Sequence, residues 1–134
     1  MITLCKIDGK SYDVLVTAIQ ENYSVVEGAN IGTALHRDRE IRDITGIKIG
    51  HSITFDADKD MAEFDELTEY LFGAVRPSVM LEAVHGQKTI IYEAAYSSGS
   101  RHVSHIDEDA EETAVHWSEL TVDFRPLETQ VNAE

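Results

Sequence analysis

The sequence is poor in the residues that build covalently linked or low-complexity chains. Cys5 is the only cysteine among 134 residues, so no disulfide can form within the chain, and its apolar neighbours favour a buried thiol in a strand. Two prolines and eight glycines argue against a flexible linker. No apolar run approaches the roughly 20 residues of a membrane-spanning helix, and Lys6 and Asp8 interrupt the place of a signal peptide. We expect one domain, made in the cytoplasm.

Basic residues are also scarce. The chain contains eleven lysines and arginines in total and 25 aspartates and glutamates, which gives a formal charge of −14. This balance argues against a protein that grips nucleic acid by its phosphates, because such proteins need clustered positive charge. An acidic surface suits a conduit along which DNA must slide, and it suits equally a protein that merely stays soluble.

Only residues 60–73 have helical periodicity. Asp60 and Glu63 have the spacing of a capping box, and Gly73 predicts a left-handed residue that ends the helix. The expected apolar stripe comprises Met61, Phe64, Leu67, Leu71 and Phe72 with Thr68, opposite the acidic Asp65, Glu66 and Glu69. The helix should therefore bury one face and expose the other.

The rest of the chain favours strands joined by hairpins. Asp8-Gly9-Lys10 predicts a turn between strands at residues 2–7 and 11–19, and residues 21–27 predict a third strand after a bend. Further strands are predicted over residues 41–57, 79–84, 88–96 and 114–124, with a bulge or bend near Gly46 and Gly50 and a hairpin turn at His85-Gly86-Gln87. The predicted fold is α+β and mainly β, an antiparallel β-sandwich or barrel of six or seven strands with one flanking helix over about residues 60–73. Residues 1–126 form its domain, and residues 127–134 a short polar C-terminal tail.

Two long stretches, residues 28–40 and 97–112, lack an apolar face and are predicted to be irregular. The second contains five acids in the six positions from Asp107 to Glu112. Such a loop must be solvated or bound to a partner.

The candidate metal-binding and catalytic motifs match their consensus patterns incompletely or weakly. Asp56, Asp58 and Asp60 resemble the start of an EF-hand loop, but Met61 replaces its glycine and Leu67 its closing glutamate. His102 and His105, with the acids beyond them, lack the four defined ligands of a zinc site. Ser97 to Ser100 form no nucleophile elbow, and no glycine-rich phosphate loop is present. We predict no enzymatic activity, cofactor or metal. Trp117, on an alternating strand, favours a place in the core or at a subunit interface.

The order of segments resembles that of small structural proteins from the tails of bacteriophages and prophages of Gram-positive bacteria. The likeness rests on the Asp8-Gly9-Lys10 turn, the glycine-containing loop that leads into Ile41-Arg42-Asp43-Ile44-Thr45-Gly46, the turn at Ser97 to Ser100, the short acidic helix, and the last strand from Trp117 to Phe124. It implies a tail-tube-like fold that assembles into rings in a tail tube, at a tail end or in a baseplate, and hence a place in the virion tail. Residues 36–40 are more charged than the family's loop, and the resemblance supplies no catalytic residue.

Our first hypothesis is a non-enzymatic phage tail protein whose partners are copies of itself and other tail proteins, with DNA passing without specific binding. The residues predicted for the assembly interface are Gly28, Asn30, Gly32, His36, Arg37, Arg39, Arg42, Arg101, His102 and Trp117. Deleting residues 29–39 is expected to leave a folded monomer that no longer assembles. The alternative is a monomeric binding module whose acidic loop, residues 107–112, captures a basic partner or a divalent cation.

Overall fold

The computed structural model describes residues 5–27, 32–33, 40–41, 44–58, 61–108 and 114–132. In these residues the chain forms, in order, β1 (Cys5–Ile7), β2 (Val14–Glu27), β3 (Gly32–Thr33), β4 (Glu40–Ile41), β5 (Ile44–Ala57), α1 (Ala62–Phe72), β6 (Val79–His85), β7 (Lys88–Ala95), β8 (Gly99–Asp107), β9 (Ala114–Pro126) and β10 (Val131–Asn132). The fold is α+β and mainly β with one helix, as the sequence predicted.

Eight of the strands form a single antiparallel sheet that curls into an open half-barrel, while β3 and β4 pair only with each other. Strand β9 is the central strand of the sheet and pairs with β5, β7 and β8. Its Val122 pairs with Ile53 of β5 on one edge and with Gly99 of β8 on the other, and its last residues pair with β7. From β7 the sheet continues through β6 to β1, and from β5 it continues to β2 along one edge and to β10 along the other.

The core lies between the concave face of this sheet and α1. Phe64, Leu67 and Leu71 are the buried residues of the helix, spaced three and four apart as an amphipathic helix requires. They meet side chains of one face of the sheet, namely Ile7, Ile53, Phe55, Val79, Leu81, Ala83, Tyr92, Ala94, Leu120, Val122 and Phe124. Dispersion and the exclusion of water from this cluster hold α1 on the sheet.

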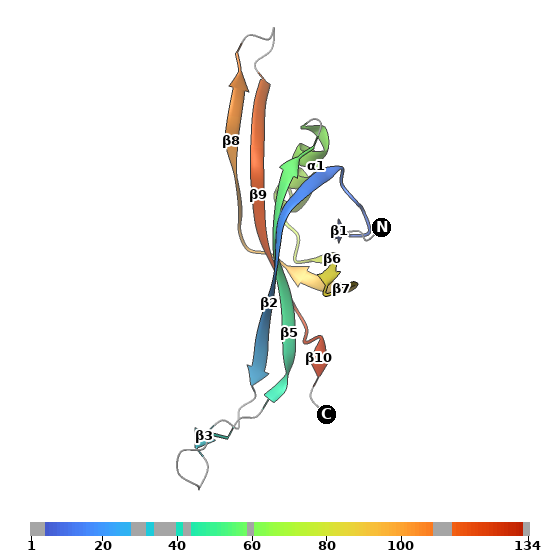
Figure 1. Cartoon of the computed structure of the whole chain (residues 1–134), viewed down its shortest axis with the longest axis vertical. Coiled ribbons are helices and arrows are strands. Elements are labelled where there is room, and N and C mark those ends of the chain that lie inside the picture. Colours follow the sequence, from blue (N-terminus) through green and yellow to red (C-terminus); the bar gives the residue numbers. More distant parts are fainter. Residues whose placement is uncertain are drawn as a thin grey trace.

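Two ribbons extend beyond the core in opposite directions (Figure 1). We call them the lower arm, in which Asn22–Glu27 of β2 pairs with Ile44–Gly50 of β5, and the upper arm, in which His102–Asp107 of β8 pairs with Ala114–Ser118 of β9. The lower arm leads to β3, and the upper arm leads to the acidic segment predicted to be a loop. The molecule is therefore elongated, with a small core between two arms.

The predicted N-terminal hairpin is wrong, although its turn is correct. Asp8 and Gly9 both have positive φ, 51° and 81°, and Ile7 bridges to Lys10 across the turn. The strands on either side then diverge, because β1 pairs with β6 and β2 pairs with β5. The strand predicted separately at residues 21–27 is the continuation of β2, which runs unbroken over 14 residues.

The prediction that residues 97–112 are irregular is wrong for most of the stretch, because Gly99–Asp107 forms β8. Most of β8 is solvent-exposed on both faces, so it carries none of the apolar alternation by which a half-buried strand is recognised. Residues 109–113 lie outside the described part of the chain.

The faces predicted for the last strand are correct only from Leu120 onward. Glu119 has a positive φ of 55°, and the register with β8 shifts by one residue there. This bulge inverts the alternation, so Trp117 lies on the same face as Leu120 and packs against the core instead of opposite it. A second bulge on β5, beside Gly46, agrees with the predicted irregularity.

Both ends of the helix differ from the prediction. The residue before the first turn is Met61, which makes no side-chain cap, and Asp60 lies outside the described residues. Gly73 is not left-handed: its φ is −85°, and its N–H donates to the carbonyl of Glu69. A side chain at Gly73 would overlap Glu69, so close approach explains the glycine better than backbone handedness.

The predicted C-terminal tail returns to the sheet. The side-chain oxygen of Gln130 accepts from the N–H of Ile49 at 3.0 Å, and its amide nitrogen donates to the carbonyl of Ile49 at 2.7 Å. Directly after Gln130, β10 pairs with residues 46–47 of β5. The side chain of Gln130 thereby acts as a short piece of strand.

Candidate functional site

Two long strand edges are the most unusual surfaces of the described structure. Strand β2 pairs only with β5, and β8 pairs only with β9, so within the described residues each has one edge that meets no other strand. Such an edge presents unpaired N–H and C=O groups that can pair with another chain. Natural proteins block exposed edges with lysine, proline or β-bulges. Neither lysine nor proline occurs in β2 or β8, and each strand contains one bulge, at Thr17 and Ser104 respectively.

The arms also expose apolar side chains. Tyr23 is 65% exposed and Val25 46% exposed on the lower arm, where Ile44 is exposed as well. On the upper arm Val103, Ile106 and Val115 are exposed, and Ile106 lies directly opposite Val115. Apolar side chains beside a free sheet edge are typical of a surface that becomes covered on association.

Arg101 and Trp117, both predicted interface residues, meet at the base of the upper arm. The guanidinium lies 4.4 Å from the centre of the Trp117 ring, and Nη1 donates to Asp65 of α1 at 2.8 Å. The backbone N–H of Trp117 donates to the sulfur of Met61, 3.3 Å away. These contacts fasten the upper arm to the helix, so Arg101 and Trp117 position the arm and do not themselves form its outer surface.

The other predicted interface residues divide into two groups. His102 is exposed on β8, with its Nε2 3.1 Å from the hydroxyl of Ser118, and Gly32 lies in β3 opposite Ile41. The remainder lie outside the described residues, namely Gly28, Asn30, His36, Arg37, Arg39 and Arg42.

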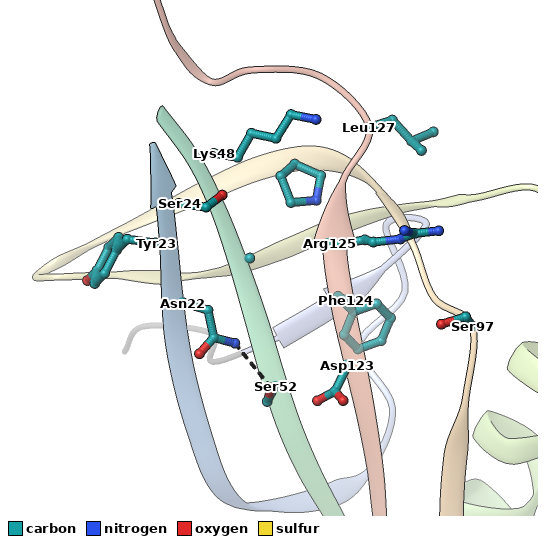
Figure 2. Close-up of a pocket in the computed structure, with 12 residues that line it drawn as sticks. Asn22, Tyr23, Ser24, Lys48, Ser52, Ser97, Asp123, Phe124, Arg125 and Leu127 are labelled. Atoms are coloured by element: carbon teal, nitrogen blue, oxygen red, sulfur yellow. Dashed lines mark hydrogen bonds between the residues drawn. The ribbon is translucent and has the colours of Figure 1, made fainter. Parts of the chain in front are cut away.

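A groove of about 620 Å³ lies on the convex face of the sheet where the lower arm leaves the core (Figure 2). Strands β2 and β5 form one wall, and the end of β9 with Ser97 forms the other. Gly50 leaves the floor open, and a Cβ there would come within 2.8 Å of the carbonyl oxygen of Phe124. The glycine that predicted a bend therefore serves a close approach of backbones.

The groove is polar and carries both charges. Asn22 donates to the hydroxyl of Ser52 at 3.1 Å across its floor. Lys48 and Arg125 lie toward one end of the groove, and Asp123 lies toward the other end beside Ser52, with which it pairs (Figure 2). Hydroxyl, amide and charged groups of this kind can hold a polar segment of another chain by hydrogen bonds. Tyr23 extends the groove with an exposed aromatic ring.

A cluster around Glu21 ties the lower arm to the core. Its carboxylate accepts from Nδ1 of His85 at 2.6 Å and from the hydroxyl of Tyr23, and it lies 3.4 Å from Nε2 of the fully buried His51. Nε2 of His51 donates to the carbonyl of Val84 at 2.8 Å, so Nδ1 accepts from the hydroxyl of Tyr92. Every polar atom of His51 is thus satisfied, which makes it a structural histidine.

Burial and hydrogen bonding shift the pKa of Glu21 in opposite directions. Desolvation favours the neutral acid, but the hydrogen bonds from Tyr23 and His85, together with the electrostatic attraction of His85 and His51, outweigh it, and the pKa of Glu21 is lowered. Elsewhere in the core, burial and the nearby Glu82 raise the pKa of the Cys5 thiol to about 12. The thiol therefore stays protonated and unreactive at neutral pH.

Within the described residues, no helix is long and apolar enough to cross a membrane. In the same part of the chain no three metal-ligating side chains converge on one point. Comparisons with protein-family models, with curated proteins and with solved structures returned no match to this chain.

Sequence reasoning placed the interface in two irregular stretches and missed the free edge of β2, the groove and the Glu21 cluster. The edge was missed because β2 was divided into two strands. The groove and the cluster join residues from strands distant in the sequence, so no local spacing could indicate them. The absence of lysine and proline from residues 14–27 was the one available signal for an unprotected edge.

Proposed function

We propose that this protein is a non-enzymatic structural subunit that assembles with copies of itself through the edges of its two arms, as a component of a bacteriophage tail. The observation that carries the self-assembly is the pair of long edges on β2 and β8 that meet no other described strand and contain neither lysine nor proline. They lie on different arms, so joining β2 of one copy to β8 of the next is a head-to-tail contact. Repeated contacts of that kind close into rings or continue as tubes.

The charge and the resemblance bear on where such an assembly works. A formal charge of −14 keeps phosphate from adhering to the surface, which suits a tube wall along which DNA moves. The assignment to a phage tail rests on the resemblance of the segment order, and the elongated shape with a small core agrees with a subunit that is completed by its neighbours (Figure 1).

The test is the assembly state of the purified protein, measured by light scattering after size exclusion and by negative-stain imaging. A double variant, Tyr23→Lys with Val25→Lys, places two charges on the free strand of the lower arm. We expect it to be folded by circular dichroism but monomeric, because lysine on an edge strand prevents pairing. The control is Ile91→Lys on β7, a similarly exposed residue that lies outside both arms and pairs with Glu82 of β6.

Rings or tubes that persist in the control and vanish in the double variant support the proposal. A wild-type protein that remains monomeric at high concentration contradicts it, and favours a monomeric binding module in its place. A double variant that assembles as well as the wild type contradicts the role of the β2 edge.

A further inference from the structure

The upper arm brings together two histidines that the sequence places 11 residues apart. His105 of β8 lies directly opposite His116 of β9, and the centres of their rings are 5.5 Å apart with a tilt of 35° between the planes. The bulge at Ser104 produces this pairing, because it shifts the register by one residue and brings both imidazoles to the same face. We propose that His105 and His116 bind a divalent transition-metal ion of the zinc type.

The rings of this pair make no hydrogen bond within the described residues, whereas each of the other described histidines uses at least one ring nitrogen in a hydrogen bond. His51 is held by Tyr92 and Val84, His85 by Glu21, and His102 by Ser118. Among the described residues neither the ring of His105 nor that of His116 has a hydrogen-bond partner. Both rings can therefore turn about their side-chain bonds without losing an existing interaction.

The spacing fits two ligands of one ion. Imidazole nitrogens bind zinc at about 2.0–2.1 Å, so two ligands of a tetrahedral ion are about 3.3 Å apart. Because a ring nitrogen lies roughly 1 Å from the ring centre, centres 5.5 Å apart allow facing nitrogens at that separation after small rotations. Imidazole is a preferred ligand of zinc, nickel and copper, and not of calcium or magnesium.

A cavity of about 390 Å³ lies beside His116. Its lining includes His116, Asp56 and Asp58, whereas His105 lies outside it. Carboxylates near a metal accept hydrogen bonds from its bound waters and raise its affinity. Since no third protein ligand converges in the described residues, water completes the coordination, and the site is weaker than a structural zinc site.

This histidine pair differs from the zinc site considered in the sequence analysis, which combined His102 and His105 with acids that follow them in the chain. In the structure His102 contacts Ser118, and His105 lies opposite a histidine of the neighbouring strand. The proposal is independent of self-assembly, because both ligands come from one chain.

The test is a titration of the full chain, free of any histidine tag, with zinc chloride in a buffer that does not bind metal. Calorimetry should show saturable binding of one ion per chain with a Kd below about 1 mM. His105→Ala and His116→Ala should each weaken binding by roughly tenfold or more, since even loss of a supporting outer group costs about that much. His102→Ala, an exposed histidine on the same strand, should bind like the wild type.

Nitrogen-detected NMR of the imidazole rings separates metal binding from a change in fold. Zinc should shift or broaden the ring signals of His105 and His116 and leave those of His51, His85 and His102 in place. Absence of saturable binding, unchanged affinity in His105→Ala or His116→Ala, or an equal loss in His102→Ala would each overturn the assignment.

Discussion

The guanidinium of Arg101 lies over the ring of Trp117, 4.4 Å from its centre, while its Nη1 donates to Asp65 at 2.8 Å. The three residues belong to β8, β9 and α1, so one side chain joins the upper arm to the only helix of the described chain. The arm carries one of the two free edges, and its direction relative to the core depends on this contact.

Arg101→Ala should lower the free energy of unfolding by about 1–2 kcal/mol. A cation over an aromatic ring contributes about 0.5–2 kcal/mol, and the ion pair adds less, because Asp65 is half exposed. Urea denaturation measures the loss, and hydrogen exchange in β8 should become faster. Arg125→Ala, in the groove and exposed, is the control and should change stability by less than about 0.5 kcal/mol. Equal stabilities of the two variants would contradict the role of the contact.

Local signals in the sequence were sufficient for turns and for the helix. The Asp8-Gly9 turn and the Gly86 turn each need a positive φ, and the apolar stripe of α1 needs only the helical period. These features depend on residues adjacent in the sequence, which is why they were predicted correctly.

Pairing between distant strands could not be predicted. Nothing in residues 5–7 indicates β6 as their partner, and the left-handed residue that inverts the face of Trp117 is a glutamate, a residue type that does not signal a bulge. Arg101 and Trp117 were identified as interface residues, but their mutual contact depends on that bulge. The free edges, too, become visible only when every strand has been assigned its neighbours.

Glu21 should make stability depend on pH. Burial raises its pKa in the folded state, but hydrogen bonds from Tyr23 and His85 and the electrostatic attraction of His85 and His51 outweigh burial, so the pKa is lowered. The unfolded chain therefore binds the proton more readily, and the stabilisation by Glu21 is present above the ordinary glutamate pKa of about 4.3 and is lost as pH falls through the lowered value. Denaturation between about pH 3 and 7 should follow this course.

Glu21→Gln isolates the contribution of the charge. The amide keeps the shape and one acceptor, so we expect a loss of about 1 kcal/mol at pH 7 and a flatter pH profile in the acidic range. Glu128→Gln, an exposed position beyond β9, should reproduce the wild-type profile. If both variants titrate like the wild type, the Glu21 cluster does not contribute to acid stability.

Substitution of Gly46 tests whether residues 127–132 are packed on β5 in solution. A Cβ at Gly46 would overlap the side chain of Thr129 and the carbonyl oxygen of Val131, so Gly46→Ala should force β10 away from β5 and cost about 1–3 kcal/mol. In a chain that ends at Pro126 the obstacle is gone. There the same substitution should be neutral or slightly stabilising, because alanine restricts the unfolded chain more than glycine does.

Gly50→Ala provides the matched control, made both in the full chain and in the chain that ends at Pro126. Its Cβ would meet the carbonyl oxygen of Phe124 at 2.8 Å, a contact with β9 that the shortened chain retains. The cost of Gly50→Ala should therefore be the same in both chains, whereas that of Gly46→Ala should disappear on truncation. Urea denaturation of the six proteins gives the comparison directly. Equal costs of Gly46→Ala in the two backgrounds would show that residues 127–132 are not held on β5 in solution, and that the polar tail expected from the sequence describes them better.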